Sequence, residues 1–142
     1  MFAGINGRHM RNFILAIFLV SSIGTGAELF LLEHMEDFWQ WVPLVLILLS
    51  STLIVWLHLS PTKTISQIFY GLMLLSMFSA GLGIFFHLKG NIEFELEMYP
   101  NMGGLKLIWE SLKGATPALA PGTMLASGMI GLLYLRVSKT DN

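Results

Sequence analysis

The chain has 142 residues, of which 54% are hydrophobic and only 12% are charged, and it contains no cysteine. A soluble domain usually carries about 25% charged residues, and a chain this short cannot hide so much apolar surface in one aqueous core. Its net charge of −1 and the lack of a Lys/Arg run argue against a nucleic-acid binder. With a mean hydropathy of +0.68, the composition indicates an integral membrane protein whose main partner is the lipid bilayer.

Four segments meet or approach the roughly 20 apolar residues that a helix needs to cross the hydrocarbon core. The sequence predicts them at 12–32, 41–59, 68–88 and 115–135. The last two are rich in small residues spaced four apart, which allow helix backbones to approach closely in lipid. We therefore expect a single all-α domain over residues 1–142, built as a bundle of four transmembrane helices.

The first segment resembles a signal peptide, because Arg8 and Arg11 precede it and small residues follow at 24–27. Its apolar run continues past those small residues, so we expect a retained helix. Five of the eight basic residues fall on the side of the two termini, which favours cytoplasmic termini in a bacterial-type inner membrane. Seven of the nine acidic residues then lie on the opposite, outer side.

The outer connection 89–114 is too long for a simple turn and long enough to carry function. Residues 91–98 alternate polar and apolar side chains. An extended backbone would place Glu93, Glu95 and Glu97 on one face, whereas a helix would align only Glu93 and Glu97.

A short amphipathic helix is expected at 105–112, after the breaker sequence 99–104. Its apolar residues, Leu105, Ile108, Trp109 and Leu112, would face the membrane, so that the helix lies along the interface.

Two titratable residues near the outer ends of the helices suggest a site. Glu28 lies inside the first span, where a carboxylate is costly and usually faces the bundle interior. We expect it on a small polar stripe with Ser21, Gly24 and Thr25. His87 follows a similar stripe of small residues on the third helix, so both side chains are expected to point inward.

The sequence therefore predicts a metal-cation site at the outer end of the bundle, with Glu28 and His87 as its main ligands. Mixed imidazole and carboxylate ligands suit Fe, Zn, Mn or Cu. The further candidate ligands on this side are His34, Asp37, Glu93, Glu95 and Glu97. A haem between His34 and His87 is a less favoured alternative.

Some of these residues, and two prolines, can also be explained by a purely structural role. Asp37, with Gln40 three residues later, also fits an N-cap of the second helix. Glu28 also fits a protonated or hydrogen-bonded packing role. Pro117 would be harmless near a helix start, whereas Pro121 should kink the fourth helix or break its first turn.

Two other functions remain open: a non-catalytic accessory or assembly subunit of a larger membrane complex, and a homo-oligomeric proton or ion pathway through Glu28. No nucleophile-base pair or phosphate-binding loop is visible, and the sequence leaves open whether the protein is an enzyme.

Overall fold

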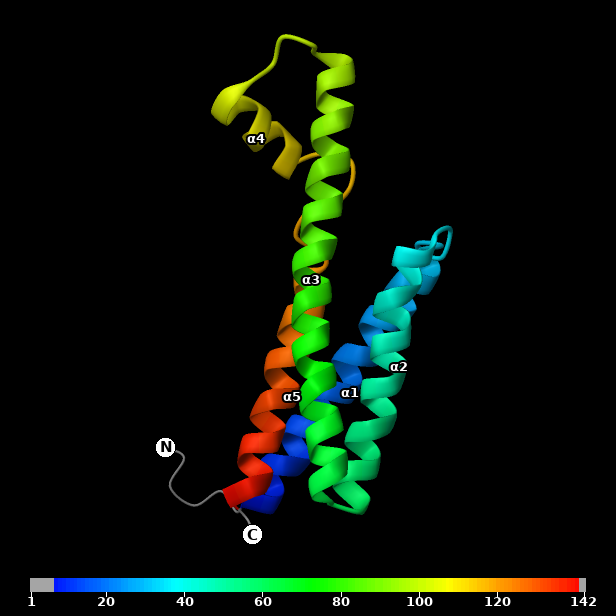
Figure 1. The fold of residues 1–142 in the computed structure, drawn as a ribbon, viewed down its shortest axis with the longest axis vertical. Helices are drawn as coiled ribbons and strands as arrows, with labels where there is room; N and C mark the ends of the chain where they lie inside the picture. Colours follow the sequence, from blue (N-terminus) through cyan, green and yellow to red (C-terminus); the bar gives the residue numbers. More distant parts are fainter. Residues whose placement is uncertain (1–6, 141–142) are drawn as a thin grey trace.

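In a computed structural model, the described residues 7–140 form five helices and contain no strand (Figure 1). Side chains are described for residues 7–138. The helices are α1 (Gly7–Leu31), α2 (Phe38–Leu59), α3 (Lys63–Met98), α4 (Gly104–Leu112) and α5 (Gly122–Thr140). The protein is therefore all-helical over this part of the chain, in agreement with the sequence prediction.

Three of these helices, α1, α2 and α3, are long and apolar enough to cross a membrane. This confirms the membrane character that the composition indicates. α5 has 19 residues and includes Arg136, and it is not among the three. A fourth crossing therefore stays a prediction.

The α3 helix is much longer than the sequence predicts, because it continues past residue 88 to Met98. Its 36 residues make a helix about 54 Å long, compared with a hydrocarbon core of about 30 Å. Residues 91–98 are therefore helical and not extended. The reason is that Glu, Leu and Met favour helix and that Pro100 is the first proline after the start of α3.

One face of α3 forms the centre of the fold. Ile65, Phe69, Met73, Ser76 and Ala80 are all buried and recur at intervals of three or four residues, as expected for one face of an α-helix. The expected stripe of small residues is thus a packing surface.

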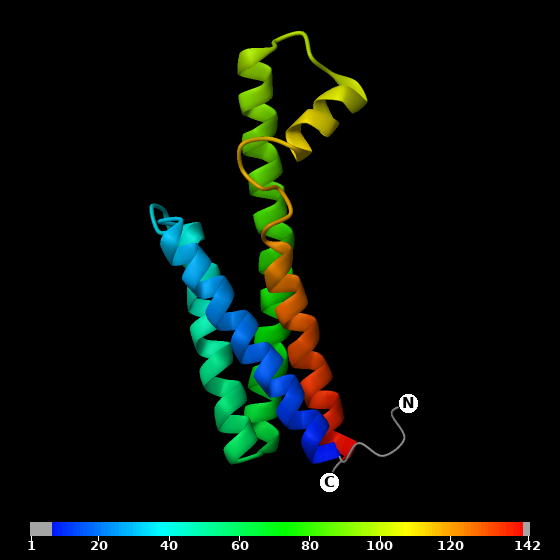
Figure 2. The ribbon, with the colours of Figure 1, turned by 180° about the vertical axis from the view of Figure 1, so that it is seen from behind.

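Most of the buried apolar residues lie at one end of the bundle, where α1, α2, α3 and α5 pack together. We name it the basic end, because α1 begins there with Arg8 and Arg11 and α5 ends there with Arg136. The opposite end, with the α1–α2 loop and α4, is named the acidic end. Towards it, the α1–α2 hairpin leans away from α3 (Figures 1 and 2).

The closest helix contact joins α3 and α5 through glycine. A Cβ atom on Gly128 would lie 2.9 Å from the Met73 carbonyl oxygen and 2.5 Å from Met77 Cγ. Backbone atoms cannot move aside as a side chain can, so this position requires the absence of a side chain.

We expect Gly128→Ala to lower the free energy of unfolding by about 1–3 kcal/mol through overpacking, even though alanine favours helix. A Cβ on Gly81 would meet nothing within 4 Å, so Gly81→Ala is the matched control and should be neutral or slightly stabilising. The measurement is unfolding in detergent followed by circular dichroism. Equal stability of both variants would contradict the close α3–α5 contact.

Candidate functional site

The α1–α2 loop places His34 through a tight helix end. The amide of His34 donates to the Leu29 carbonyl (2.9 Å) and the amide of Glu33 donates to that of Phe30 (3.1 Å). Glu33 has a positive φ of 52°. These features make a Schellman motif, in which a left-handed residue closes the helix. The position of His34 is thus set by backbone hydrogen bonds.

His87 is positioned beside the Pro117 carbonyl, which lies in the irregular segment before α5. Pro121 has no amide hydrogen and cannot bond the carbonyl of Pro117 four residues earlier, so a regular helix cannot run through both. α5 accordingly begins at Gly122, seven residues later than predicted. The Pro117 carbonyl accepts from the amide of Ala120 (3.1 Å) and also faces His87 Nδ1 at 3.1 Å. The predicted interruption at Pro121 is confirmed.

The two imidazoles lie side by side at the acidic end. Their ring centres are 6.1 Å apart, with the planes inclined by 53°. Partial burial lowers the pKa of His34 from its usual 6.5, the positive charge of His87 lowers it further, and the carboxylate of Asp37 opposes both effects. His34 is therefore mainly neutral at pH 7.

Glu28 does not join this pair. Its side chain is exposed, and no described side chain from 7–138 forms a salt bridge or hydrogen bond with its carboxylate. The inward orientation that the sequence predicts is wrong. The core face of α1 is the row Ile14, Phe18 and Ser22, and Glu28 lies about 120° around the helix from Ser22. An ion pathway through Glu28 stays a prediction.

Asp37 is the N-cap of α2, as the structural interpretation predicts. Its Oδ1 accepts hydrogen bonds from the amides of Trp39 (2.8 Å) and Gln40 (3.1 Å). Gln40 Oε1 in turn accepts from the amide of Glu36 (2.7 Å). Asp37 therefore orders the α1–α2 loop, and its charge acts on the neighbouring His34.

The three glutamates of residues 91–98 do not form one row. Glu93 and Glu97 are exposed and four residues apart, which places them on the same side of α3, and Glu95 lies elsewhere on the helix. Glu93 pairs with Lys89 at 3.5 Å.

Asn91 is the functional-looking residue that sequence reasoning missed. It is only 2% exposed. Its Nδ2 donates to the carbonyls of Ser111 (2.9 Å) and Thr116 (2.7 Å). Its Oδ1 accepts from the amide and the hydroxyl of Thr116. Gly114 packs on the same amide, since a Cβ there would lie 2.5 Å from Asn91 Cγ.

We name the hydrogen bonds of Asn91 to Ser111 and Thr116 the clamp. It fixes a projecting unit of residues 88–112, which we name the arm. The arm comprises α3 beyond His87, the following turn and α4 (Figure 1). α4 confirms the predicted short helix, whereas its predicted position along the membrane interface stays a prediction. Its apolar face does not pack onto α3: Leu105 is 85% exposed and Trp109 61%, and Ile108 and Leu112 are also exposed. The arrangement therefore presents an uncovered apolar face on a rigid support.

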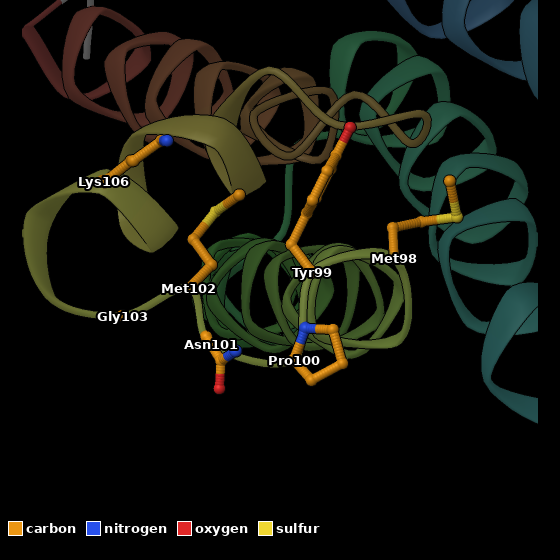
Figure 3. Close-up of a pocket in the computed structure, with 7 residues that line it drawn as sticks. All are labelled: Met98, Tyr99, Pro100, Asn101, Met102, Gly103 and Lys106. Carbon is orange, nitrogen blue, oxygen red and sulfur yellow. The ribbon is translucent and has the colours of Figure 1, made fainter.

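The tip of the arm contains an open hollow of about 540 Å³. In Figure 3, Tyr99 and Met102 lie on the side of α4, whereas Asn101 and Pro100 face away. The hollow is lined by Met98, Tyr99, Pro100, Asn101, Met102, Gly103 and Lys106. The hollow borders α4 and has a mixed polar and apolar lining.

Within residues 7–138, no group of three or more His, Cys, Asp or Glu side chains could hold a metal ion. The structure thus brings His34 and His87 together but leaves Glu28, Glu93, Glu95 and Glu97 apart from them. No protein-family model, curated protein or solved structure matches the chain, so its function has to be inferred from its own residues.

We expect Asn91→Ala to release α4 without unfolding the spanning helices. The change leaves the Thr116 amide and carbonyl without their Asn91 partner, at a cost of about 1–3 kcal/mol each. The Ser111 carbonyl keeps the amide of Gly114 (3.3 Å). Hydrogen exchange measured by mass spectrometry should show at least ~10-fold faster exchange in α4. Asn101→Ala, at the exposed turn, is the control. Unchanged exchange in Asn91→Ala would contradict the clamp.

His34 should make stability depend on pH. Because its folded-state pKa is lowered, the unfolded chain binds more protons just below pH 6.5, and the free energy of unfolding falls as the pH falls through that window. His34→Gln should reduce this slope between about pH 5 and 6.5, measured by unfolding in detergent with a chelator present. His9→Gln, at the exposed start of α1, should keep it. An identical slope in His34→Gln would contradict the lowered pKa.

Proposed function

We propose that the protein is a non-catalytic accessory subunit that anchors in the membrane through its apolar helices and docks a partner subunit on the arm. The observation that carries this proposal is the exposed apolar face of α4. A contiguous apolar surface that water would otherwise cover is typical of an interaction site. Trp109, at the middle of this face, is the residue type most enriched among residues that dominate binding energy.

The length of α3, compared with the thickness of a membrane, supports a partner outside the hydrocarbon core. The Trp39 and Phe86 rings pack with their centres 5.7 Å apart, and aromatic residues collect at membrane surfaces. From Ile65 to Phe86, α3 rises by about 32 Å, close to the ~30 Å of a hydrocarbon core. The following residues up to Met98 continue for about 18 Å. Most of α4 thus lies beside a part of α3 that projects into water.

The charge of the arm favours a cationic protein over an anionic bilayer as the occupant. Residues 88–112 carry four glutamates against two lysines. Glu93 pairs with Lys89, and Glu97 is exposed on α3. Like charges would repel anionic lipid headgroups. The partner that fits is an extramembrane segment of another membrane subunit, apolar at its centre and flanked by Lys or Arg.

The rigidity of the arm supports docking. α3 is one unbroken helix from the membrane to Met98, and Asn91 joins it to both ends of the segment 111–116. The surface is therefore ordered before a partner arrives, which reduces the entropy cost of binding.

We expect Trp109→Glu to release the protein from its complex in native membranes. After mild solubilisation, wild-type protein should migrate on native gels together with one identifiable membrane subunit. That subunit should copurify with it at fixed stoichiometry. The substitution should weaken that association by at least ~30-fold, the effect of removing a central binding residue. Added salt should also weaken it, because the charges are complementary.

Asn101→Glu is the matched control, since it adds the same charge to the arm on the side facing away from α4 (Figure 3). It should leave the complex intact. A photo-crosslinker at Leu105 should then join the same subunit, while one at Asn101 should not. Migration of the wild-type protein alone, or crosslinks from Leu105 to lipid only, would overturn the proposal.

A further inference from the structure

The pairing of His34 and His87 suggests a second site, separate from the face of α4. The two residues come from different elements, and each is held in place independently. His34 follows the Schellman motif at the end of α1, and His87 lies on the packing face of α3 beside the Pro117 carbonyl. We propose that His34 and His87 together bind one divalent transition-metal ion of the zinc or copper type at the acidic end.

The distance between the rings is close to what a shared ion needs. A tetrahedral metal bound at about 2.0–2.1 Å from one nitrogen of each imidazole places the ring centres roughly 5 Å apart, and only a nearly linear arrangement places them about 6.5 Å apart. The observed separation of 6.1 Å is about 1 Å wider than a tetrahedral site needs. Little movement of the α1–α2 hairpin is therefore needed for both rings to reach one ion.

The hydrogen bond of His87 prepares its second nitrogen for a metal. When Nδ1–H donates to the Pro117 carbonyl at 3.1 Å, Nε2 carries the free lone pair. Histidines that bind metals almost always donate their other ring N–H to a carbonyl, a carboxylate or water in this way. The Pro117 carbonyl also accepts from the amide of Ala120 at 3.1 Å, so its position is fixed by the backbone.

The remaining electrostatics suit a cation. Asp37 acts on His34 as a nearby negative charge, which favours a bound cation. Both imidazoles are only partly buried, so an ion can enter from solvent. With two protein ligands, the other coordination positions belong to water or an added small ligand. Imidazole nitrogen favours Zn²⁺ and Cu²⁺ over Mg²⁺ or Ca²⁺.

The test is titration of the purified, chelator-treated protein in nanodiscs with Zn²⁺ alone by calorimetry. Wild-type protein should bind one Zn²⁺ per chain, and His34→Ala or His87→Ala should each weaken binding at least tenfold. The double variant should lose saturable binding, because neither imidazole remains. Cu²⁺ should give an electron paramagnetic resonance spectrum with hyperfine coupling to two imidazole nitrogens, reduced to one in each single variant.

Two controls separate this site from other histidines and from the sequence prediction. His58→Ala changes the histidine that faces Tyr134 at the basic end, and Glu28→Gln changes the exposed carboxylate of α1. Both should bind Zn²⁺ as the wild type does. If His87→Ala fails to fold, His34→Gln, in a loop set by backbone bonds, carries the test. Absence of saturable Zn²⁺ binding, or full binding in the double variant, would overturn the proposal.

Discussion

The structure depends on one continuous face of α3. This face begins with Ile65 and Phe69 in the apolar core and passes through Ser76 and Ala80. It ends with Asn91, buried under the segment that joins α4 to α5. A single helix can do both because its side chains repeat with the same period throughout. In the apolar core the face packs small and apolar residues closely, and at Asn91 it uses an amide that satisfies four hydrogen-bonding groups.

The two prolines before α5 determine the path of the backbone between α4 and α5. In a regular helix through residues 115–121, the backbone carbonyls would accept from amides of that helix and would not bond to side chains of α3. Pro121 breaks that pattern, and the irregular segment then bonds to α3 through the Pro117 carbonyl and Thr116. His87 and Asn91, one helical turn apart, receive these contacts. An unpaired backbone group costs several kcal/mol near lipid, so such side chains are needed wherever a helix is interrupted.

Much of the fold follows from local chemistry and could be predicted: the apolar helices, the Asp37 cap, the break at Pro121 and the short helix α4. The orientation of Glu28 could not, because α1 offers two stripes. One holds small polar residues with Glu28, and the other holds Ile14, Phe18 and Ser22. Only packing against the other helices selects the second. The role of Asn91 could not be predicted either, because its partners lie 20 and 25 residues away and no local pattern predicts them.

The proposed metal site and the proposed docking face both lie at the acidic end but need not be coupled. A ligand shifts another site only through a difference in its affinity for two conformations. An ion between His34 and His87 would join the α1–α2 hairpin to α3, whereas α4 is held to α3 by Asn91 in the same unbroken helix. The ion would therefore restrain the hairpin and leave the arm unchanged. Coupling would arise only if a partner on the arm also contacted the α1–α2 loop, where Phe38 and Trp39 are exposed.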